Sequence, residues 1–268
     1  MSAGPTQHLD RAGGRIAYDV EGQGLPVILV PGAGDVRSHH AALANLLVER
    51  GFMAVRADLR GHGDSDAGFS SYELPAVADD LLALMDAVGG RAAVVAQGVA
   101  AGAAVLAAAD KRARVAGLVL VSPRVRPKRA GLADHTLGAA AQWQPWGPAV
   151  WLSYYRSLYP GQPPGEQKAH VRDMRQALRR PGHWQATVRL SRTSLAPTVA
   201  ALAQVKTRVL VVVGAKDREL RDAAAEGTWV AQQLRGRRLI VATAGHYPSA
   251  ESPEVVGPEV VRFLSKVR

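Results

Sequence analysis

Short apolar runs and longer amphipathic segments alternate along the chain. The runs are rich in Val, Ile, Leu and Ala and are short, so they predict strands. They lie at residues 15–20, 26–31, 52–57, 91–96, 115–121, 208–213 and 237–242. Segments with helical spacing separate most of them and lie at residues 38–50, 72–88, 100–109, 220–234 and 253–267. The alternation predicts an α/β fold with a mostly parallel, doubly wound sheet.

Two of the predicted helices carry start signals. Ser70 and Glu73 have the spacing of a capping box at the start of the helix at 72–88. Ser252 is expected to cap the last helix, with Pro253 at its first position.

The segment 125–203 breaks this rhythm because it holds no convincing strand. It carries 11 basic and three acidic residues, so it supplies most of the chain's net charge of +10. It also holds seven of the 14 aromatic residues, namely Trp143, Trp146, Trp151, Tyr154, Tyr155, Tyr159 and Trp184. We therefore expect a helical cap over one end of the sheet, inserted into a core formed by residues 1–124 and 204–268.

One apolar stretch, residues 92–109, has the length of a membrane span and only one polar side chain, Gln97. It is mostly Ala and Gly, so a buried strand, turn and helix explains it better. The first 14 residues lack the apolar segment of a secretion signal. We expect a cytoplasmic protein that does not bind membranes. The chain has no cysteine, which excludes disulfides and a cysteine nucleophile.

Four motifs occur in the order and at the spacing of the α/β-hydrolase fold. They are PGAG at 31–34, DLRGHGDSD at 58–66, GAKD at 214–217 and AGH at 244–246. Each is modest alone, but together they make the chain resemble that family over nearly its whole length. The resemblance implies an oxyanion loop at the first motif, a catalytic acid at Asp217 and a catalytic histidine at His246.

The family's nucleophile position holds a glycine in this chain. Family members place the nucleophile in a G-x-S-x-G turn between a strand and a helix, whereas residues 96–100 read AQGVA and put Gly98 there. Glycine offers no attacking atom, so the covalent acyl-enzyme route is closed. Glycine also adopts positive φ without steric cost, so we expect an unstrained turn and a space that a water molecule can occupy.

The resemblance also implies the rest of the site. The backbone N–H groups of Ala33 and Val99 would form the oxyanion hole, and Asp217 would orient His246 as a general base. We expect the substrate to contact residues of the turns and the cap: Gly32, Gln97, Ser122, Trp143, Trp146, Trp151, Tyr154 and Tyr155.

Three hypotheses about Gly98 stay open. In the first, the His246–Asp217 dyad acts as a general base on water or on the substrate, giving hydrolysis or a lyase- or cyclase-type step. In the second, the chain is a non-catalytic relative that binds a ligand. In the third, Gly98 is an engineered replacement of a serine in an esterase. Retention of both dyad residues favours the first and third hypotheses.

Asp35, His39 and His40 follow the first motif. Adjacent histidines point in different directions on a helix, so they make a poor chelating pair. We expect both histidines at the surface or the pocket rim, and Asp35 on the loop surface. We expect no metal ligands and no cofactor.

The basic residues of the cap include Arg172, Arg175, Arg179 and Arg180, of which the first three share one helix face. We expect a solvated face. A small-molecule substrate, including an anionic one, is the expected partner. Nucleic acid is not expected, because no recognition motif accompanies the charge.

Overall fold

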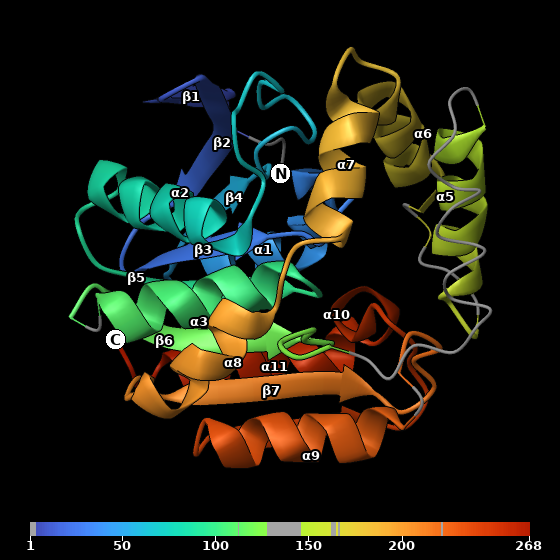
Figure 1. The fold of residues 1–268 in the computed structure, drawn as a ribbon. Coiled ribbons are helices and arrows are strands. Elements are labelled where there is room, and N and C mark those ends of the chain that lie inside the picture. The colour runs from blue at the N-terminus through green and yellow to red at the C-terminus, as the bar shows by residue number, and fades with distance from the viewer. Residues whose placement is uncertain (1–3, 112, 128–145, 162–164, 166, 221) are drawn as a thin grey trace.

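An eight-stranded sheet forms the centre of the computed structural model, which describes residues 4–111, 113–127, 146–161, 165, 167–220 and 222–268 (Figure 1). Its spatial order is β1-β2-β4-β3-β5-β6-β7-β8. The strands are β1 Gln7–Arg11, β2 Gly14–Gly22, β3 Pro26–Val30, β4 Met53–Ala57, β5 Ala92–Gln97, β6 Val115–Val121, β7 Val209–Gly214 and β8 Arg237–Val241. Strands β1, β2 and β4 pair antiparallel, and all the other pairings are parallel. The predicted α/β fold with a mostly parallel sheet is confirmed.

Helices cover both faces of this sheet. Apolar residues of α2 (Leu74–Ala87), α3 (Ala100–Asp110) and α9 (Ala223–Gln233) pack on one face. Those of α1 (Ala41–Glu49) and α11 (Pro253–Leu264) pack on the other. Strands β5 and β6 are therefore buried along their whole length, which explains why their sequences hold almost no polar residue.

The seven predicted strands all form, each within two residues of its expected ends. The sequence analysis missed β1, Gln7–Arg11, because this edge strand is largely exposed and has no alternating apolar face. The stretch 92–109 is β5, a turn and α3, as expected. No helix among the described residues has both the length and the apolar character needed to cross a bilayer.

The expected capping box at Ser70 is wrong. Helix α2 begins at Leu74, whose backbone N donates to Thr193 Oγ1 at 3.3 Å. The carboxylate of Glu73 reaches the same segment, where it accepts hydrogen bonds from Thr193 Oγ1 and from the backbone N of Ser194. Residues 193–194, far along the chain, thus supply the hydrogen-bond partners at the start of α2. Ser252 does stand at the cap position of α11 with Pro253 first in the helix, but its side chain makes no capping hydrogen bond.

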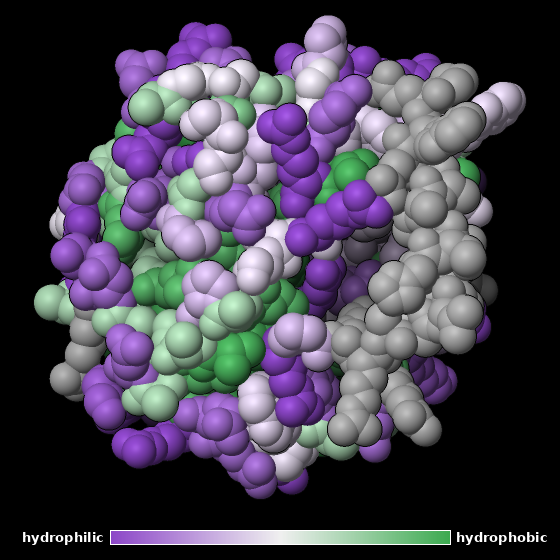
Figure 2. All heavy atoms as spheres, viewed as in Figure 1, coloured by the Kyte–Doolittle hydropathy of each residue, from purple (hydrophilic) through white to green (hydrophobic). Residues whose placement is uncertain are grey.

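Helices α5 (Gly147–Ser157), α6 (Gln167–Leu178) and α7 (His183–Ser191) lie beyond the carboxyl ends of the parallel strands (Figure 1). They share an apolar cluster of their own, which includes Leu152, Met174 and Trp184. Helix α8 (Ala196–Ala201) instead packs on α3, where Thr198 Oγ1 donates to the carbonyl of Gly102. Hydrophobic residues also gather on the outer surface over α3 and α8 (Figure 2).

The remaining described helices are short. They are η1 Arg37–His40, η2 Leu202–Gln204 and α10 Pro248–Glu251.

A buried carboxylate ties the sheet edge to α2. Asp80 is 4% exposed and accepts hydrogen bonds from Arg60 Nε at 2.7 Å and Arg11 Nε at 2.9 Å. Arg60 also lies over the ring of Phe69, with its guanidinium carbon 4.7 Å from the ring centroid. Asp80 and its two arginine partners therefore hold β1 and the turn at 58–66 against α2.

Replacing Asp80 with alanine should lower the free energy of unfolding by ~3–5 kcal/mol, because it leaves the buried Arg60 without its counter-charge. Urea unfolding measures the change. Asp79→Ala, at an exposed position of the same helix, is the matched control and should stay within about 0.5 kcal/mol of the parent. Equal stability of the two variants would show that the buried pair contributes nothing.

Candidate active site

The turn between β5 and α3 places Gly98 at the edge of the sheet. Gly98 has φ +57, in the left-handed region that glycine adopts without steric cost. Its backbone N donates to the carbonyl of Val121 at 2.9 Å, and its own carbonyl accepts from the backbone N of Arg124 at 3.0 Å. The neighbouring strand β6 and the segment after it therefore fix the shape of the turn, whatever side chain stands at position 98.

The position that a side chain would take at Gly98 is open. A Cβ there would lie 3.6 Å from His246 Nε2 and 4.0 Å from the Cα of Gly32, which are ordinary contact distances. The imidazole therefore stands beside the point where family members carry their nucleophile. A water molecule or a substrate atom fits there.

His246 and Asp217 come from the loops after β8 and β7. His246 Nδ1 lies 2.8 Å from Asp217 Oδ2, and the two residues are 7% and 3% exposed. The other carboxylate oxygen of Asp217 accepts from the backbone N of Glu219 at 2.8 Å. With Nδ1 donating to Asp217, Nε2 is the nitrogen that faces Gly98, as a general base requires.

Two further contacts hold the histidine loop. Gln97, fully buried, donates from Nε2 to the backbone carbonyl of His246 at 2.8 Å. Gly214 lets the two loops approach, because a Cβ there would overlap the backbone carbonyls of Gly245 and Ala244. The glycine of the GAKD motif is thus a packing requirement of the dyad.

The oxyanion loop follows β3. Ala33 and Val99, whose N–H groups are predicted to hold an oxyanion, line the same pocket as Gly98 and His246. Val99 directly precedes α3, so the positive end of that helix dipole faces the pocket. Gly34 has φ +72, and a Cβ there would overlap the indole of Trp151. A cap tryptophan therefore packs directly on the oxyanion loop.

The pocket between the sheet and the cap has a volume of about 600 Å³. Of the predicted substrate contacts, five line it: Gly32, Gln97, Trp151, Tyr154 and Tyr155. Lining residues that the sequence analysis did not name are Arg124, Pro127, Leu158, Ser191, Thr193, Ser194, Leu195, Ala196, Glu219 and Tyr247. No motif marks these residues, and they come from several separate segments, so only the folded chain brings them together.

Two of the predicted contacts that the structure describes do not line this pocket. Ser122 is 1% exposed, and its backbone N donates to the carbonyl of Val212, which keeps the residue inside the sheet edge. Trp146 is 70% exposed at the start of α5. Trp143 lies outside the described residues.

The phenol groups of the cap tyrosines have hydrogen-bond partners. Tyr154 donates to Glu219 Oε1 at 2.9 Å, and the hydroxyl groups of Tyr155 and Tyr159 lie 2.8 Å apart. Burial raises the pKa of Tyr155 well above its ordinary value, so this phenol stays neutral.

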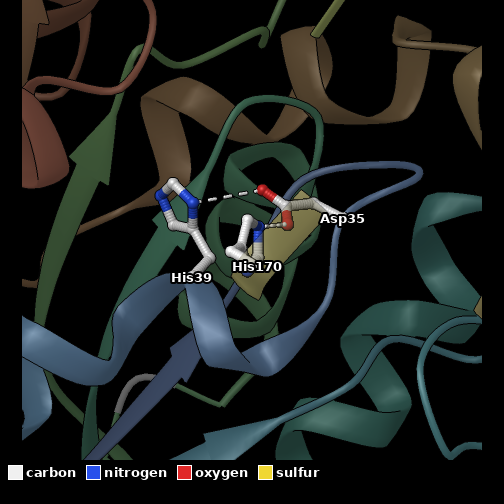
Figure 3. A group of neighbouring side chains, drawn as sticks. All are labelled: Asp35, His39 and His170. Atoms are coloured by element: carbon white, nitrogen blue, oxygen red, sulfur yellow. Dashed lines mark hydrogen bonds and ion pairs between the residues drawn. The ribbon is translucent and has the colours of Figure 1, made fainter. Parts of the chain in front are cut away.

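The expectations for Asp35, His39 and His40 are wrong. Asp35 is 2% exposed, His40 is 1% exposed and the side chain of His39 is 1% exposed. Asp35 lies between His39 and His170, a residue of α6 (Figure 3). Burial alone would raise the pKa of Asp35, but the neighbouring His170 and His39 outweigh it and lower this pKa to about 2. Asp35 and His39 stand four residues apart, a spacing that the sequence analysis overlooked in favour of the adjacent histidine pair.

The basic face of the cap is solvated, as expected, because Arg172, Arg175 and Arg179 are all exposed. Arg180 lies off this face. It donates to Asp64 Oδ1 at 2.9 Å and to the carbonyl of Gly63 at 2.6 Å, so it joins the cap to the turn at 58–66.

Comparison with known proteins gives a family match. The model of the Alpha/beta hydrolase family matches residues 27–258. No curated protein matches the chain.

Many solved structures share the fold. A thermophilic esterase from Thermogutta terrifontis is 24% identical with a TM-score of 0.80, covering 97% of this chain and 99% of its own. The enol-lactonase from Burkholderia xenovorans LB400 is 20% identical with a TM-score of 0.81, covering 97% and 100%. An esterase from Exiguobacterium antarcticum is 16% identical with a TM-score of 0.82, covering 98% and 99%.

Replacing Gln97 with methionine, which keeps the length but removes the amide, should lower the free energy of unfolding by about 1–3 kcal/mol. The reason is that the backbone carbonyl of His246 loses its donor. Thermal and urea unfolding measure the change. Gln233→Met, at an exposed position of α9, is the control. If Gln97→Met had the same free energy of unfolding as the parent, the amide would not hold the histidine loop.

Proposed function

Because the chain belongs to the Alpha/beta hydrolase family, we propose that it is an enzyme in which His246 and Asp217 work without a covalent nucleophile. The proposed substrate is a small, largely apolar carbonyl compound such as an ester or a lactone. The proposed reaction uses no cofactor. The proton that His246 takes comes from a water molecule or from the substrate itself.

The geometry at Gly98 carries this proposal. The imidazole Nε2 stands 3.6 Å from the point where a Cβ would be, in a pocket that also holds both predicted oxyanion residues. A water molecule needs about 10–15 Å³ of accessible space and two to four polar partners. The backbone N–H groups of Ala33 and Val99 and the imidazole supply polar groups around this position.

Hydrolysis follows from this arrangement without an acyl-enzyme. His246 Nε2 takes a proton from water, and the oxygen of that water forms a bond to the carbonyl carbon. The carbonyl oxygen becomes an oxyanion that the two backbone N–H groups stabilise. When the intermediate collapses, the bond to the leaving oxygen breaks, and His246 returns the proton to that oxygen. Asp217 stabilises the imidazolium between these steps.

The pocket lining supports the substrate class. Trp151, Tyr155, Leu158 and Leu195 present mainly apolar surface, whereas Arg124 and Glu219 supply charge at other points of the lining. Arg124 Nη2 donates to the carbonyl of Ser191 at 2.7 Å, which fixes its guanidinium. A mostly apolar molecule with one polar end fits such a lining, and an anionic end would meet Arg124.

The first test is turnover of a panel of aryl esters and lactones by the parent, His246→Ala and Gly98→Ala. The parent should turn over a member of the panel, and His246→Ala should lose about 10²–10⁴-fold in kcat. Gly98→Ala should lose at least about tenfold, because its methyl group would lie 3.6 Å from Nε2 and exclude the water. Parent-like activity in Gly98→Ala would overturn the role of the space, and parent-like activity in His246→Ala would overturn the role of the base.

Gly98→Ser tests the covalent alternative. The open position beside His246 Nε2 accommodates the CH₂OH group, so the variant should show a burst of product from an acyl-enzyme, which the parent lacks. Because φ at this position is +57, the variant should also be about 1–2 kcal/mol less stable than the parent. Gly98→Ala carries the same backbone cost without a nucleophile and is the control. An inactive parent combined with an active Gly98→Ser would contradict the proposal and favour ligand binding or a replaced serine.

A further inference from the structure

A second group of polar side chains is buried at the seam between the sheet and the cap. Asp35 follows β3, His39 belongs to η1, and His170 lies on α6. Each offers one ligand atom, and these three atoms all lie within 4.8 Å of one another. Figure 3 shows the carboxylate of Asp35 linked to both imidazole rings. The dyad chemistry proposed for His246 uses none of them.

We propose that Asp35, His39 and His170 bind a divalent transition-metal ion of the zinc type. Two imidazole nitrogens and one carboxylate oxygen are a donor set that zinc and its neighbours prefer, with water as the fourth ligand. The inference is independent of the reaction proposed for the dyad.

The contacts of Asp35 with the two imidazoles are near the spacing that an ion requires. His170 Nε2 lies 2.7 Å from Asp35 Oδ1, and His39 Nδ1 lies 3.2 Å from Asp35 Oδ2. Ligands at ~2.0–2.2 Å from a tetrahedral zinc ion stand about 3.4 Å apart. The His170 contact must therefore widen by about 0.7 Å and the His39 contact by about 0.2 Å.

The carboxylate has an unused oxygen. Asp35 Oδ1 accepts from His170 and from the backbone N of Val36 at 2.7 Å. Asp35 Oδ2 is buried and has no hydrogen-bond partner among the described residues, although His39 Nδ1 is close. A buried charged oxygen without a hydrogen bond is costly, and an ion between it and the imidazole would remove that cost.

Neighbouring side chains orient and enclose the two proposed histidine ligands. Ser38 Oγ lies 2.8 Å from His170 Nδ1, so it fixes the ring and leaves Nε2 toward Asp35. The ring of Tyr247 lies 5.0 Å from that of His39, and the ring of Tyr155 lies 5.8 Å from that of His170. These aromatic rings keep the dielectric low around the site.

Arg37 does not pair with Asp35. Although it stands only two residues along the chain, it is hydrogen-bonded to Asp19, Asp58 and Asp64. Its charge is therefore already balanced by three carboxylates. The ion-pair partners of the Asp35 carboxylate among the described residues are the imidazoles of His170 and His39, the two other proposed ligands.

Metal binding would join two parts of the pocket wall. Asp35 follows the oxyanion loop at residues 31–34, whereas His170 belongs to the cap helix α6. An ion held by both would tie the cap to the loop that carries the Ala33 N–H.

The test is titration of the chelator-treated full chain with ZnCl₂, followed by calorimetry, and with CoCl₂, followed by visible absorbance. The parent should bind one ion per chain, and Co²⁺ should give the absorption of a low-coordinate site. Zinc at a hundredfold excess over its dissociation constant should raise the melting temperature by about 5 °C. A parent without a thermal shift and without a Co²⁺ spectrum overturns the proposal, and this outcome needs no variant to fold.

Variants locate the ion. His170→Gln and Asp35→Asn should weaken binding at least about tenfold. His183→Gln is the matched control, because His183 is also a buried cap histidine and its Nδ1 faces the carbonyl of Pro181 instead. His246→Gln should retain the binding. Binding lost in His246→Gln and retained in His170→Gln would place the ion at the dyad and overturn the proposal.

Discussion

A left-handed backbone turn at residue 98 forms the edge of the candidate site at which α3 begins. Its N–H and carbonyl are fixed by Val121 and Arg124, so β6 and the segment after it set its shape. The turn directs the start of α3 toward the pocket and leaves position 98 beside His246 Nε2. Because these contacts are all made by the backbone, they do not depend on the side chain at position 98.

Paired polar groups and apolar contacts both hold the cap against the sheet domain. His170 contacts Asp35, Arg180 contacts Asp64, and each pair joins a cap segment to a loop of the sheet domain. The apolar cluster of the cap also reaches the sheet domain through Val36 and Tyr247. Exposed ion pairs contribute little free energy, whereas buried ones demand correct geometry. The buried Asp35–His170 contact therefore sets the position of the cap more strictly than the exposed Arg180 pair does.

The apolar runs predicted the centre of the sheet because strands β3 to β7 are almost wholly buried. The same logic failed for β1, Gln7–Arg11, because it is an edge strand that pairs antiparallel with β2 and is largely exposed. Motif order placed Gly98, Asp217 and His246 at one edge of the sheet. The order of the motifs did not predict a role for His170, which contacts Asp35 although the two residues are 135 positions apart in the chain. Such a contact depends on how the cap docks, and no local pattern encodes docking.

The buried dyad itself argues for chemistry over simple ligand binding. Asp217 is 3% exposed, and among the described residues its carboxylate contacts His246 Nδ1 and accepts a hydrogen bond from one backbone N–H. Well-packed apolar residues can replace a buried ionic pair without loss of stability, and often with a gain. A chain that needed only a binding pocket would gain nothing from keeping this pair beside an empty nucleophile position. A base held at 3.6 Å from that position is useful when a proton must be moved there.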